Sequence, residues 1–134
     1  MTIFSKIIRG EIPGYKIAED DYFFAFLDAF PLVPGHTLVV PKVEVDRFLD
    51  MGDDYLGRIL LFAKPIALAI EKSFPCNRVG LSVVGLEVPH AHLHLIPLNT
   101  MDDINFTRGK LKPTAEELKT SQAKILAHLG HQKG

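Results

Sequence analysis

The chain has 134 residues, of which 47% are hydrophobic and 23% are charged. This composition is typical of a globular protein rather than a disordered chain, and the length suits one domain with a buried core. Lys and Arg total 15 against 16 Asp and Glu, so the net charge is -1. Such a balance gives no electrostatic basis for binding nucleic acid or an anionic membrane, although a small anionic ligand needs only a few local donors.

Cysteine usage and hydropathy exclude two further classes of protein. Cys76 is the only cysteine, so no intrachain disulfide and no four-cysteine zinc site can form. The longest apolar run, 59–70, is interrupted by Lys64 and Pro65 and is too short to span a bilayer. The N-terminal segment has no secretory pattern. We therefore expect a cytoplasmic protein with a single domain over 1–134 and with neither membrane nor nucleic acid among its partners.

The first part of the chain predicts a short helical turn and three strands. Gly10 ends the turn, and Asp20-Asp21 separates the first two strands. Gly35 supplies the backbone freedom for a turn before the third strand, which ends at Pro41. The expected elements are a helical turn over 5–9 and strands over 15–19, 22–28 and 36–41.

A long helix is predicted over 53–74, because its apolar residues recur at helical spacing. Asp53 and Asp54 favour its start, since acidic side chains complement the helix dipole in the first turn. Pro65 removes one backbone hydrogen bond inside the helix and costs roughly 3 kcal/mol. We therefore expect a kink or a split near Leu61.

The rest of the chain predicts two more strands, over 78–84 and 91–98, and a last helix. Thr114 and Glu117 form the Thr-x-x-Glu pattern of a capping box, so this helix begins at Thr114. It continues through Leu129. Helices inserted among five strands, without regular alternation, predict an α+β fold with a mainly antiparallel sheet.

The segment 89–97, Pro-His-Ala-His-Leu-His-Leu-Ile-Pro, contains the candidate reactive site. Side chains alternate between the two faces of a strand, so His90, His92 and His94 point the same way at a spacing of about 7 Å. The apolar residues between them face the core. Each imidazole has an unperturbed pKa near 6.5 and can act as nucleophile, acid, base or metal ligand at neutral pH.

Two other interpretations of this segment stay open on the residues alone. An exposed strand can carry polar histidines without any function. Two or three alternating histidines can also hold zinc, with Glu87 as a neighbouring ligand.

The same segment resembles the signature of the histidine triad (HIT) superfamily, and here reads His90-Ala-His92-Leu-His94-Leu-Ile96. The resemblance covers nearly the whole chain. It implies a HIT-like fold, with a five-stranded sheet, a long helix and shorter terminal helices. Other segments close to the family's pattern are 3–13, 25–28, 34–42 and 85–90.

The resemblance implies a nucleotide-binding hydrolase that cleaves nucleoside 5'-phosphoramidates or related conjugates to the nucleoside monophosphate. His92 would form a covalent nucleotidyl-histidine, with no metal and no other cofactor. His90 and His94 would bind phosphate oxygens or orient His92, and His36 would support the triad from behind. Glu87 would act as the acid for the leaving group if its pKa is raised; otherwise it only shapes its loop.

The resemblance also implies the nucleotide contacts. Asp28 matches a carboxylate that accepts hydrogen bonds from the ribose hydroxyls, although an Asp can also simply start a turn here. Phe4 and Ile7 match positions that line the nucleobase slot, and they can belong to the core as well. The expected substrates are conjugates of AMP or GMP.

Departures from the family pattern define the alternatives. Many bacterial relatives bind a structural zinc with Cys-x-x-Cys, but Thr2 and Ser5 occupy these positions, so we expect no such zinc. The stretch 80–85 is short and lacks the Asn that contacts the phosphate side of the ligand in the family. Ser82 stands near the position of that Asn. One alternative is therefore a nucleotide-binding or interaction protein with little turnover. Apart from these departures, a metal-dependent hydrolase that uses the three histidines as zinc ligands is another alternative.

Relatives with this N-terminal pattern are generally homodimers that pair a long helix and a strand across a two-fold axis. The resemblance therefore implies a homodimer. The apolar run 60–62 gives independent support, because it supplies more hydrophobic surface than one helix face needs.

Overall fold

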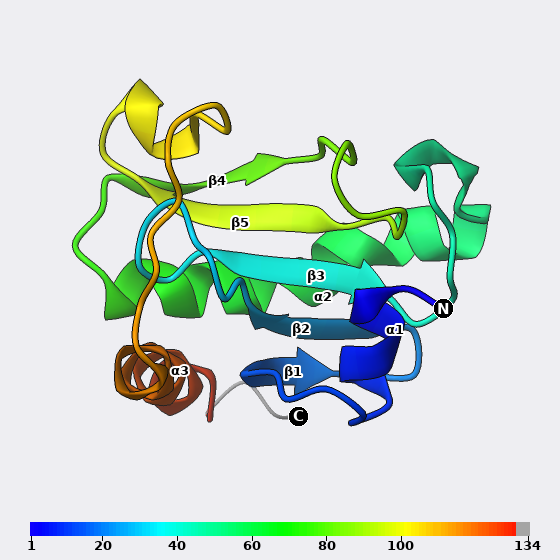
Figure 1. The fold of residues 1–134 in the computed structure, drawn as a ribbon, viewed down its shortest axis with the longest axis horizontal. Helices are drawn as coiled ribbons and strands as arrows, with labels where there is room; N and C mark the ends of the chain where they lie inside the picture. The colour runs from blue at the N-terminus through cyan, green and yellow to red at the C-terminus, as the bar shows by residue number, and fades with distance from the viewer. Residues whose placement is uncertain (131–134) are drawn as a thin grey trace.

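The computed structural model describes residues 1–130, in which five antiparallel strands form one sheet (Figure 1). The strand order is β1-β2-β3-β5-β4, so β4 lies at one edge and β1 at the other. The predicted α+β class and antiparallel sheet are confirmed. The strands are β1 Lys16–Glu19, β2 Phe23–Leu27, β3 Thr37–Pro41, β4 Arg78–Ser82 and β5 Leu93–Leu98. The helices are α1 Ile3–Ile8, α2 Asp53–Ser73 and α3 Ala115–Leu129, with 3-10 turns η1 Phe48–Asp50 and η2 Met101–Ile104.

The sheet is buried on both faces, and strand β2 shows how its residues divide. Phe23, Ala25 and Leu27 belong to the larger core cluster, whereas Phe24 and Phe26 belong to a smaller one. This division follows from the period of two along a strand. Helix α2 lies behind the sheet and α1 in front of it in the view of Figure 1.

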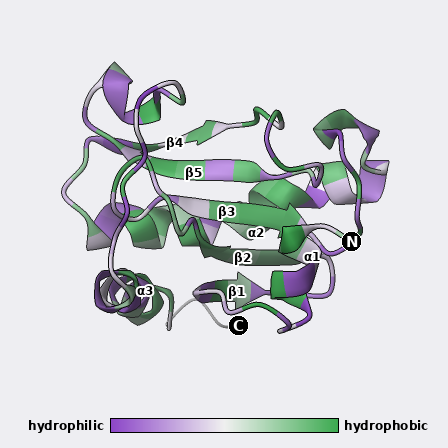
Figure 2. Cartoon of the chain, in the orientation of Figure 1, coloured by the Kyte–Doolittle hydropathy of each residue, from purple (hydrophilic) through white to green (hydrophobic). Residues whose placement is uncertain are grey.

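The larger core lies between the sheet and helices α2 and α3. Residues at helical spacing on α2 are buried there, and α3 adds Leu118 and Ile125. Apolar colouring accordingly concentrates on the strands, and the hydrophilic residues lie mainly on the helices and loops (Figure 2). The buried residues of α2 are Ile59, Ala63, Ile66, Ala69 and Ile70.

The capping box predicted for the last helix is confirmed. The Glu117 backbone N–H donates to Thr114 Oγ1, and the Thr114 N–H donates to the Glu117 carboxylate. These two bonds satisfy donors that a helix N-terminus otherwise leaves unpaired.

Helix α2 is not split, in contrast to one of the two outcomes expected from Pro65. It runs without a break over Asp53–Ser73, with Pro65 inside it. Proline has no N–H for the carbonyl of Leu61, but Leu61 is 75% exposed. Leu61 therefore lies outside the core of the chain, where leaving its carbonyl without this bond costs less than in the core.

Strand β5 begins later than predicted, at Leu93 rather than at residue 91. The last residue pair between β3 and β5 is Val39 with Leu93. Before it, the Ala91 N–H donates to the Val45 carbonyl, 2.6 Å away, and not to β3. The prediction that all three histidines lie within one strand is therefore wrong, because only His94 does.

The face in front of the sheet carries the smaller core cluster. Phe4 of α1 packs edge-on against Phe26 of β2, with the ring centroids 5.4 Å apart. Thr2 caps the helix by accepting the Ser5 N–H. Helix α1 thus closes one end of this face and leaves the rest open for a site.

Within residues 1–130, no helix has the length and apolar character that crossing a membrane requires.

Candidate active site

A cavity of about 460 Å³ opens on the α1 face of the sheet. Its wall is formed by α1, the turn after β2, the loop that follows β4, the start of β5 and the segment before α3. Seven of the nine predicted site residues line it. They are Phe4, Ile7, Asp28, His36, Glu87, His92 and His94.

The hydrogen bond of His92 fixes its tautomer. Its Nδ1 lies 2.7 Å from the carbonyl oxygen of His90, and a carbonyl can only accept. Nδ1 therefore carries the proton. Nε2 keeps a free lone pair on a side chain that lines the cavity. A neutral imidazole in this state is a nucleophile.

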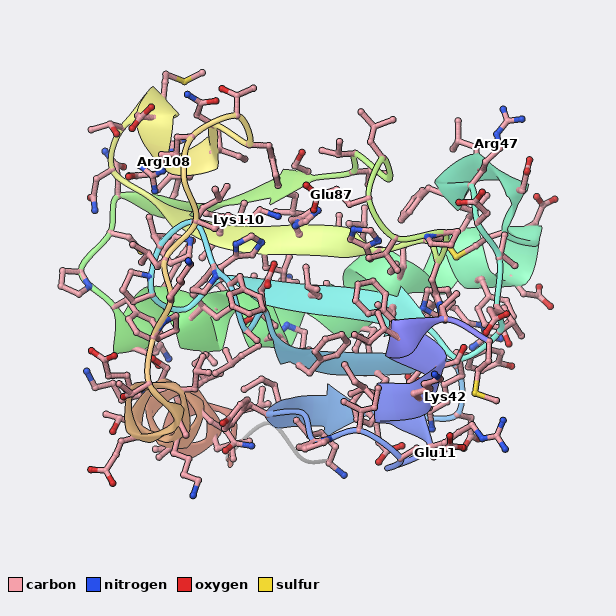
Figure 3. The ribbon with its side chains drawn as sticks, viewed as in Figure 1. Glu11, Lys42, Arg47, Glu87, Arg108 and Lys110 are labelled. Carbon is pink, nitrogen blue, oxygen red and sulfur yellow. The ribbon has the colours of Figure 1, made fainter. Side chains whose placement is uncertain are left out.

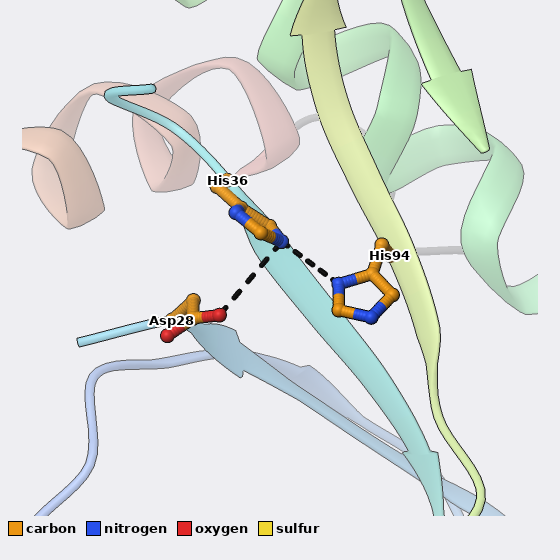
Figure 4. Close-up of side chains that lie close together, drawn as sticks. All are labelled: Asp28, His36 and His94. Atoms are coloured by element: carbon orange, nitrogen blue, oxygen red, sulfur yellow. Dashed lines mark hydrogen bonds and ion pairs between the residues drawn. The ribbon is translucent and has the colours of Figure 1, made fainter. Parts of the chain in front are cut away.

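His36 and His94 are joined by a hydrogen bond between their rings (Figure 4). The Leu32 N–H donates to His36 Nδ1 at 3.1 Å, so the proton of His36 is on Nε2. His36 Nε2 in turn donates to His94 Nδ1 at 2.9 Å. His94 must then hold its proton on Nε2. That N–H is a donor available to an anion in the cavity.

Burial keeps this pair of histidines neutral. It lowers the pKa of His94 to about 4 and that of His36 to about 3, and the neighbouring histidines and Lys110 add to both shifts. Burial also raises the pKa of Asp28, although the Phe30 N–H donated to its carboxylate opposes this change. The Asp28 carboxylate lies 3.8 Å from His36 Nε2.

His90 does not line the cavity, and both of its ring nitrogens are occupied. Nε2 donates to the Pro41 carbonyl at 2.8 Å, so Nδ1 accepts from the Thr2 hydroxyl at 2.7 Å. Its ring therefore has no position from which to bind a phosphate. Its contribution is the backbone carbonyl that orients His92.

Phe4 and Ile7 bring apolar surface to the cavity from consecutive turns of α1. The Phe4 ring meets the His92 ring edge-on, with the centroids 5.1 Å apart. Ser82 is placed elsewhere: it pairs with His94 across strands β4 and β5 and is not among the residues that line the cavity.

Residues 9–101 match the family of the HIT domain. The chain belongs to the HIT family. An uncharacterized HIT-like protein of Borreliella burgdorferi is 39% identical over 131 residues, which are 92% of this chain and 94% of that protein. Adenosine 5'-monophosphoramidase HNT1 of Saccharomyces cerevisiae is 38% identical over 96 residues, 71% of this chain and 61% of that protein. The crystal structure of a hypothetical histidine triad nucleotide-binding protein from Sulfolobus tokodaii is 28% identical, with a TM-score of 0.82 over 97% of this chain and 93% of that one.

In this HIT domain, a network of hydrogen bonds occupies the region around Thr2 and Ser5. Thr2 Oγ1 contacts His90 Nδ1, and the Ser5 hydroxyl donates to the Glu44 carboxylate at 2.5 Å. The Thr2 N–H donates to Glu44 as well, at 2.9 Å. Neutral hydroxyls are poor ligands for zinc but good partners for a histidine and a carboxylate. The network ties the start of α1 to the histidine segment.

Glu87 does not have the raised pKa that its predicted acid role requires. The Lys110 ammonium lies 2.8 Å from its carboxylate and lowers the pKa of Glu87 below the ordinary value. Glu87 is also exposed to water, so burial does little to favour its neutral form. At neutral pH this residue is a carboxylate on the cavity wall and has no proton to donate.

The segment before α3, which supplies one wall of the HIT cavity, was not predicted from the sequence. Phe106, Thr107 and Lys110 all line it. Phe106 stands edge-on to His94, with the ring centroids 4.7 Å apart. No periodicity marks this segment, because it forms neither a helix nor a strand. The sequence feature that could have indicated an anion site in this segment is its pair of basic residues, Arg108 and Lys110.

Among the described residues, Asp28, His36 and His94 are the group with spacing that would suit a metal ion. The bond between the two rings argues against that use. A metal needs the lone pairs of both nitrogens, whereas His36 Nε2 carries a proton. His90 and His92 are outside this group, so the predicted three-histidine zinc set does not assemble.

Proposed function

We propose that this HIT protein hydrolyses nucleoside 5'-phosphoramidates or related nucleotidyl conjugates to a nucleoside monophosphate. The observation that carries the proposal is the bond from His92 Nδ1 to the His90 carbonyl, which leaves Nε2 as a lone pair on the cavity wall. The yeast relative is an adenosine 5'-monophosphoramidase, and the Sulfolobus neighbour is described as a nucleotide-binding protein.

In the first step, His92 Nε2 attacks the α-phosphorus, and the bond from phosphorus to the leaving nitrogen breaks. The ring becomes a nucleotidyl-imidazolium that keeps its Nδ1 proton bonded to the His90 carbonyl. The His94 Nε2–H stabilises the charge on a phosphate oxygen. Glu87 is ionised, so the leaving amine takes its proton from water.

In the second step, a water molecule attacks the same phosphorus and the bond to His92 Nε2 breaks. The oxygen of water enters the phosphate, its protons are released, and His92 returns to its neutral tautomer. The sum of both steps is one conjugate plus one water giving one nucleoside monophosphate plus one amine. No proton transfer by Asp28 or His36 is needed, and these residues position the substrate and His94.

The cavity also suits the rest of a nucleotide. The apolar side chains of Phe4 and Ile7 offer a surface for the nucleobase, and the Asp28 carboxylate can accept hydrogen bonds from ribose hydroxyls. We propose AMP or GMP conjugates as substrates, in the cytoplasm. The reaction would proceed without a metal or another cofactor, so activity would survive a chelator.

The deciding experiment is a mass spectrum taken after brief exposure to an adenosine phosphoramidate at low temperature. We expect a nucleotidyl adduct on a peptide containing His92, and no adduct or turnover in His92→Ala. His128→Ala is the matched control, since His128 is exposed on α3 outside the cavity, and it should retain turnover. Full turnover in His92→Ala would rule out the proposed nucleophile.

The ionised state of Glu87 favours one alternative, a nucleotide-binding protein with little turnover, because no protein group lining the cavity is assigned to protonate the leaving amine. Such a protein would bind AMP in calorimetry without releasing an amine from the phosphoramidate.

We also propose that the protein is a homodimer, with a second copy as the partner. Strand β4 lies at the edge of the sheet, and within residues 1–130 its outer edge has backbone groups without a partner strand. Leu81 on β4 is 48% exposed, and Leu60, Leu61 and Leu68 on α2 are 58%, 75% and 44% exposed. In a dimer with a two-fold axis, the β4 edge and the exposed side of α2 in one copy would be covered by the same two surfaces of the second copy.

A further inference from the structure

The fixed charges of the active-site cavity are unbalanced. In the described part of the chain, Lys110 is the only lysine or arginine that lines it, whereas Asp28 and Glu87 contribute carboxylates. A nucleotide would add the negative charge of its phosphate. Without Lys110 the phosphate would meet mainly carboxylates and neutral imidazoles, so this one ammonium dominates how the cavity receives an anion.

The backbone on both sides of Lys110 is fixed to the turn after β2. The Arg108 guanidinium donates to the Leu32 carbonyl, and the Leu111 N–H donates to the Pro31 carbonyl at 2.9 Å. The same turn begins beside Asp28 of the cavity wall. The backbone at Lys110 is therefore anchored by these hydrogen bonds, and only the Lys110 side chain needs to move for the ammonium to change partners.

The present partner of Lys110 is a weakly held one. Its Nζ lies 2.8 Å from Glu87 Oε1, and both side chains are labelled in Figure 3. The Glu87 side chain is 73% exposed and that of Lys110 is 33% exposed. Water screens an ion pair in such a position, so the pair contributes little and can be exchanged. Glu87 is carried by the loop after β4, in which Gly85 has a φ of +74°.

The Lys110 charge also acts on the histidine end of the cavity. After burial and His92, it is the next cause that lowers the pKa of His94. It contributes to the lowered pKa of His36 in the same way, after burial and His94. An ammonium that influences these rings is near enough to attract a phosphate placed between Lys110 and His94.

We propose that Lys110 is the phosphate-binding cation of this cavity, and that a nucleotide phosphate displaces Glu87 from it. This inference rests on the proposed function, because it takes the ligand to be a nucleotide. It assigns Lys110 a role in recognising the anion. Glu87 has the opposite role of a competitor, which occupies the cation until the phosphate arrives.

Calorimetry with AMP and with adenosine tests the first part, because the two ligands differ by the phosphate. In Lys110→Met, the Kd for AMP should rise about tenfold while that for adenosine stays unchanged. Lys112→Met is the matched control, since Lys112 lines a neighbouring cavity and not the active-site cavity, and it should change neither Kd. An unchanged AMP affinity in Lys110→Met, or an equal loss for both ligands, would overturn the assignment.

Glu87→Gln tests the exchange by the sign of its effect. If Glu87 competes with the phosphate, AMP should bind about threefold more tightly to this variant. If Glu87 only holds Lys110 in place, AMP should bind more weakly, which would refute the exchange. In the Lys110→Met background the Glu87→Gln change should have no effect on AMP binding.

Phosphoramidate turnover, measured on the same samples, separates this inference from the proposed function. Wild-type protein that binds AMP but has no turnover would refute the hydrolase and leave the Lys110 test intact. Normal turnover in the wild type, together with an unchanged AMP affinity in Lys110→Met, would refute the Lys110 assignment and leave the hydrolase intact. Wild-type protein that neither binds AMP nor turns over the phosphoramidate would overturn both.

Discussion

His36 accepts the Leu32 N–H and donates to His94, and His92 donates to the carbonyl of His90. In both cases a backbone group sets which nitrogen of the ring carries the proton. No carboxylate is needed to fix the tautomer of His92. The Nε2 lone pair of His92, which we propose as the nucleophile, is therefore in place before any ligand binds, as long as the backbone keeps its position.

Stability should depend on pH through these buried histidines. His94 has a pKa of about 4 in the folded protein, and an ordinary histidine has about 6.5 when unfolded. Between these values the unfolded state binds more protons, so the free energy of unfolding rises with pH, by up to about 1.4 kcal/mol per pH unit for one group. Urea unfolding should therefore show a loss of stability from about pH 7 to about pH 5.

His94→Gln is the variant for this test, because its amide oxygen can still accept the His36 Nε2–H. It removes one titrating group, so the dependence of the unfolding free energy on pH should become shallower. Parallel curves for the variant and the wild type would show that His94 does not contribute.

At the scale of elements, the parts predicted from sequence were those decided by local chemistry. The capping box of Thr114 and Glu117 placed the start of α3. Alternation along the strands placed the core face of β5, where Leu93 and Leu95 join the larger core. The family signature placed His92 and His94 on one cavity.

The parts that sequence did not predict depend on contacts between distant segments. His90 was expected in the site, but Thr2, 88 residues away, and the Pro41 carbonyl occupy its ring. Lys110 was not anticipated, because it reaches the cavity from a segment without regular structure. The prediction of a raised pKa for Glu87 is wrong for the same reason, because the partner that lowers this pKa, Lys110, is 23 residues away in the sequence.

Gly35 lies in the turn before β3, and its replacement tests how tightly that turn is packed. Its φ is +94°, and an added Cβ would lie 2.8 Å from ring atoms of Phe74. Gly35→Ala should lower the free energy of unfolding by about 2–4 kcal/mol, from backbone strain and overpacking together. Urea unfolding is the measurement.

Gly109→Ala is the control, since a Cβ there meets nothing within 4 Å and no positive φ is involved. Its stability should stay within about 0.5 kcal/mol of wild type. A Gly35→Ala variant as stable as this control would mean that the Phe74 ring moves aside at no cost.

At the scale of the whole molecule, the sheet separates two functions of the chain. One face packs against α2 and forms the larger core, and the other carries the cavity with its histidines. The outer side of α2 and the edge of β4 are used by neither. These are the surfaces that we propose to pair in a homodimer.

Leu61→Glu should break that dimer. Leu61 is 75% exposed on α2, and a homodimer would bury it against a second copy, where an unpaired carboxylate is costly. Light scattering after size exclusion should give the mass of a dimer for wild type and of a monomer for the variant. Leu49→Glu is the matched control: Leu49 is 80% exposed on η1, outside both proposed surfaces, so this variant should keep the dimer mass. A wild-type protein with the 14.9 kDa mass of one chain would refute the dimer, as would a Leu61→Glu variant that keeps the mass of two.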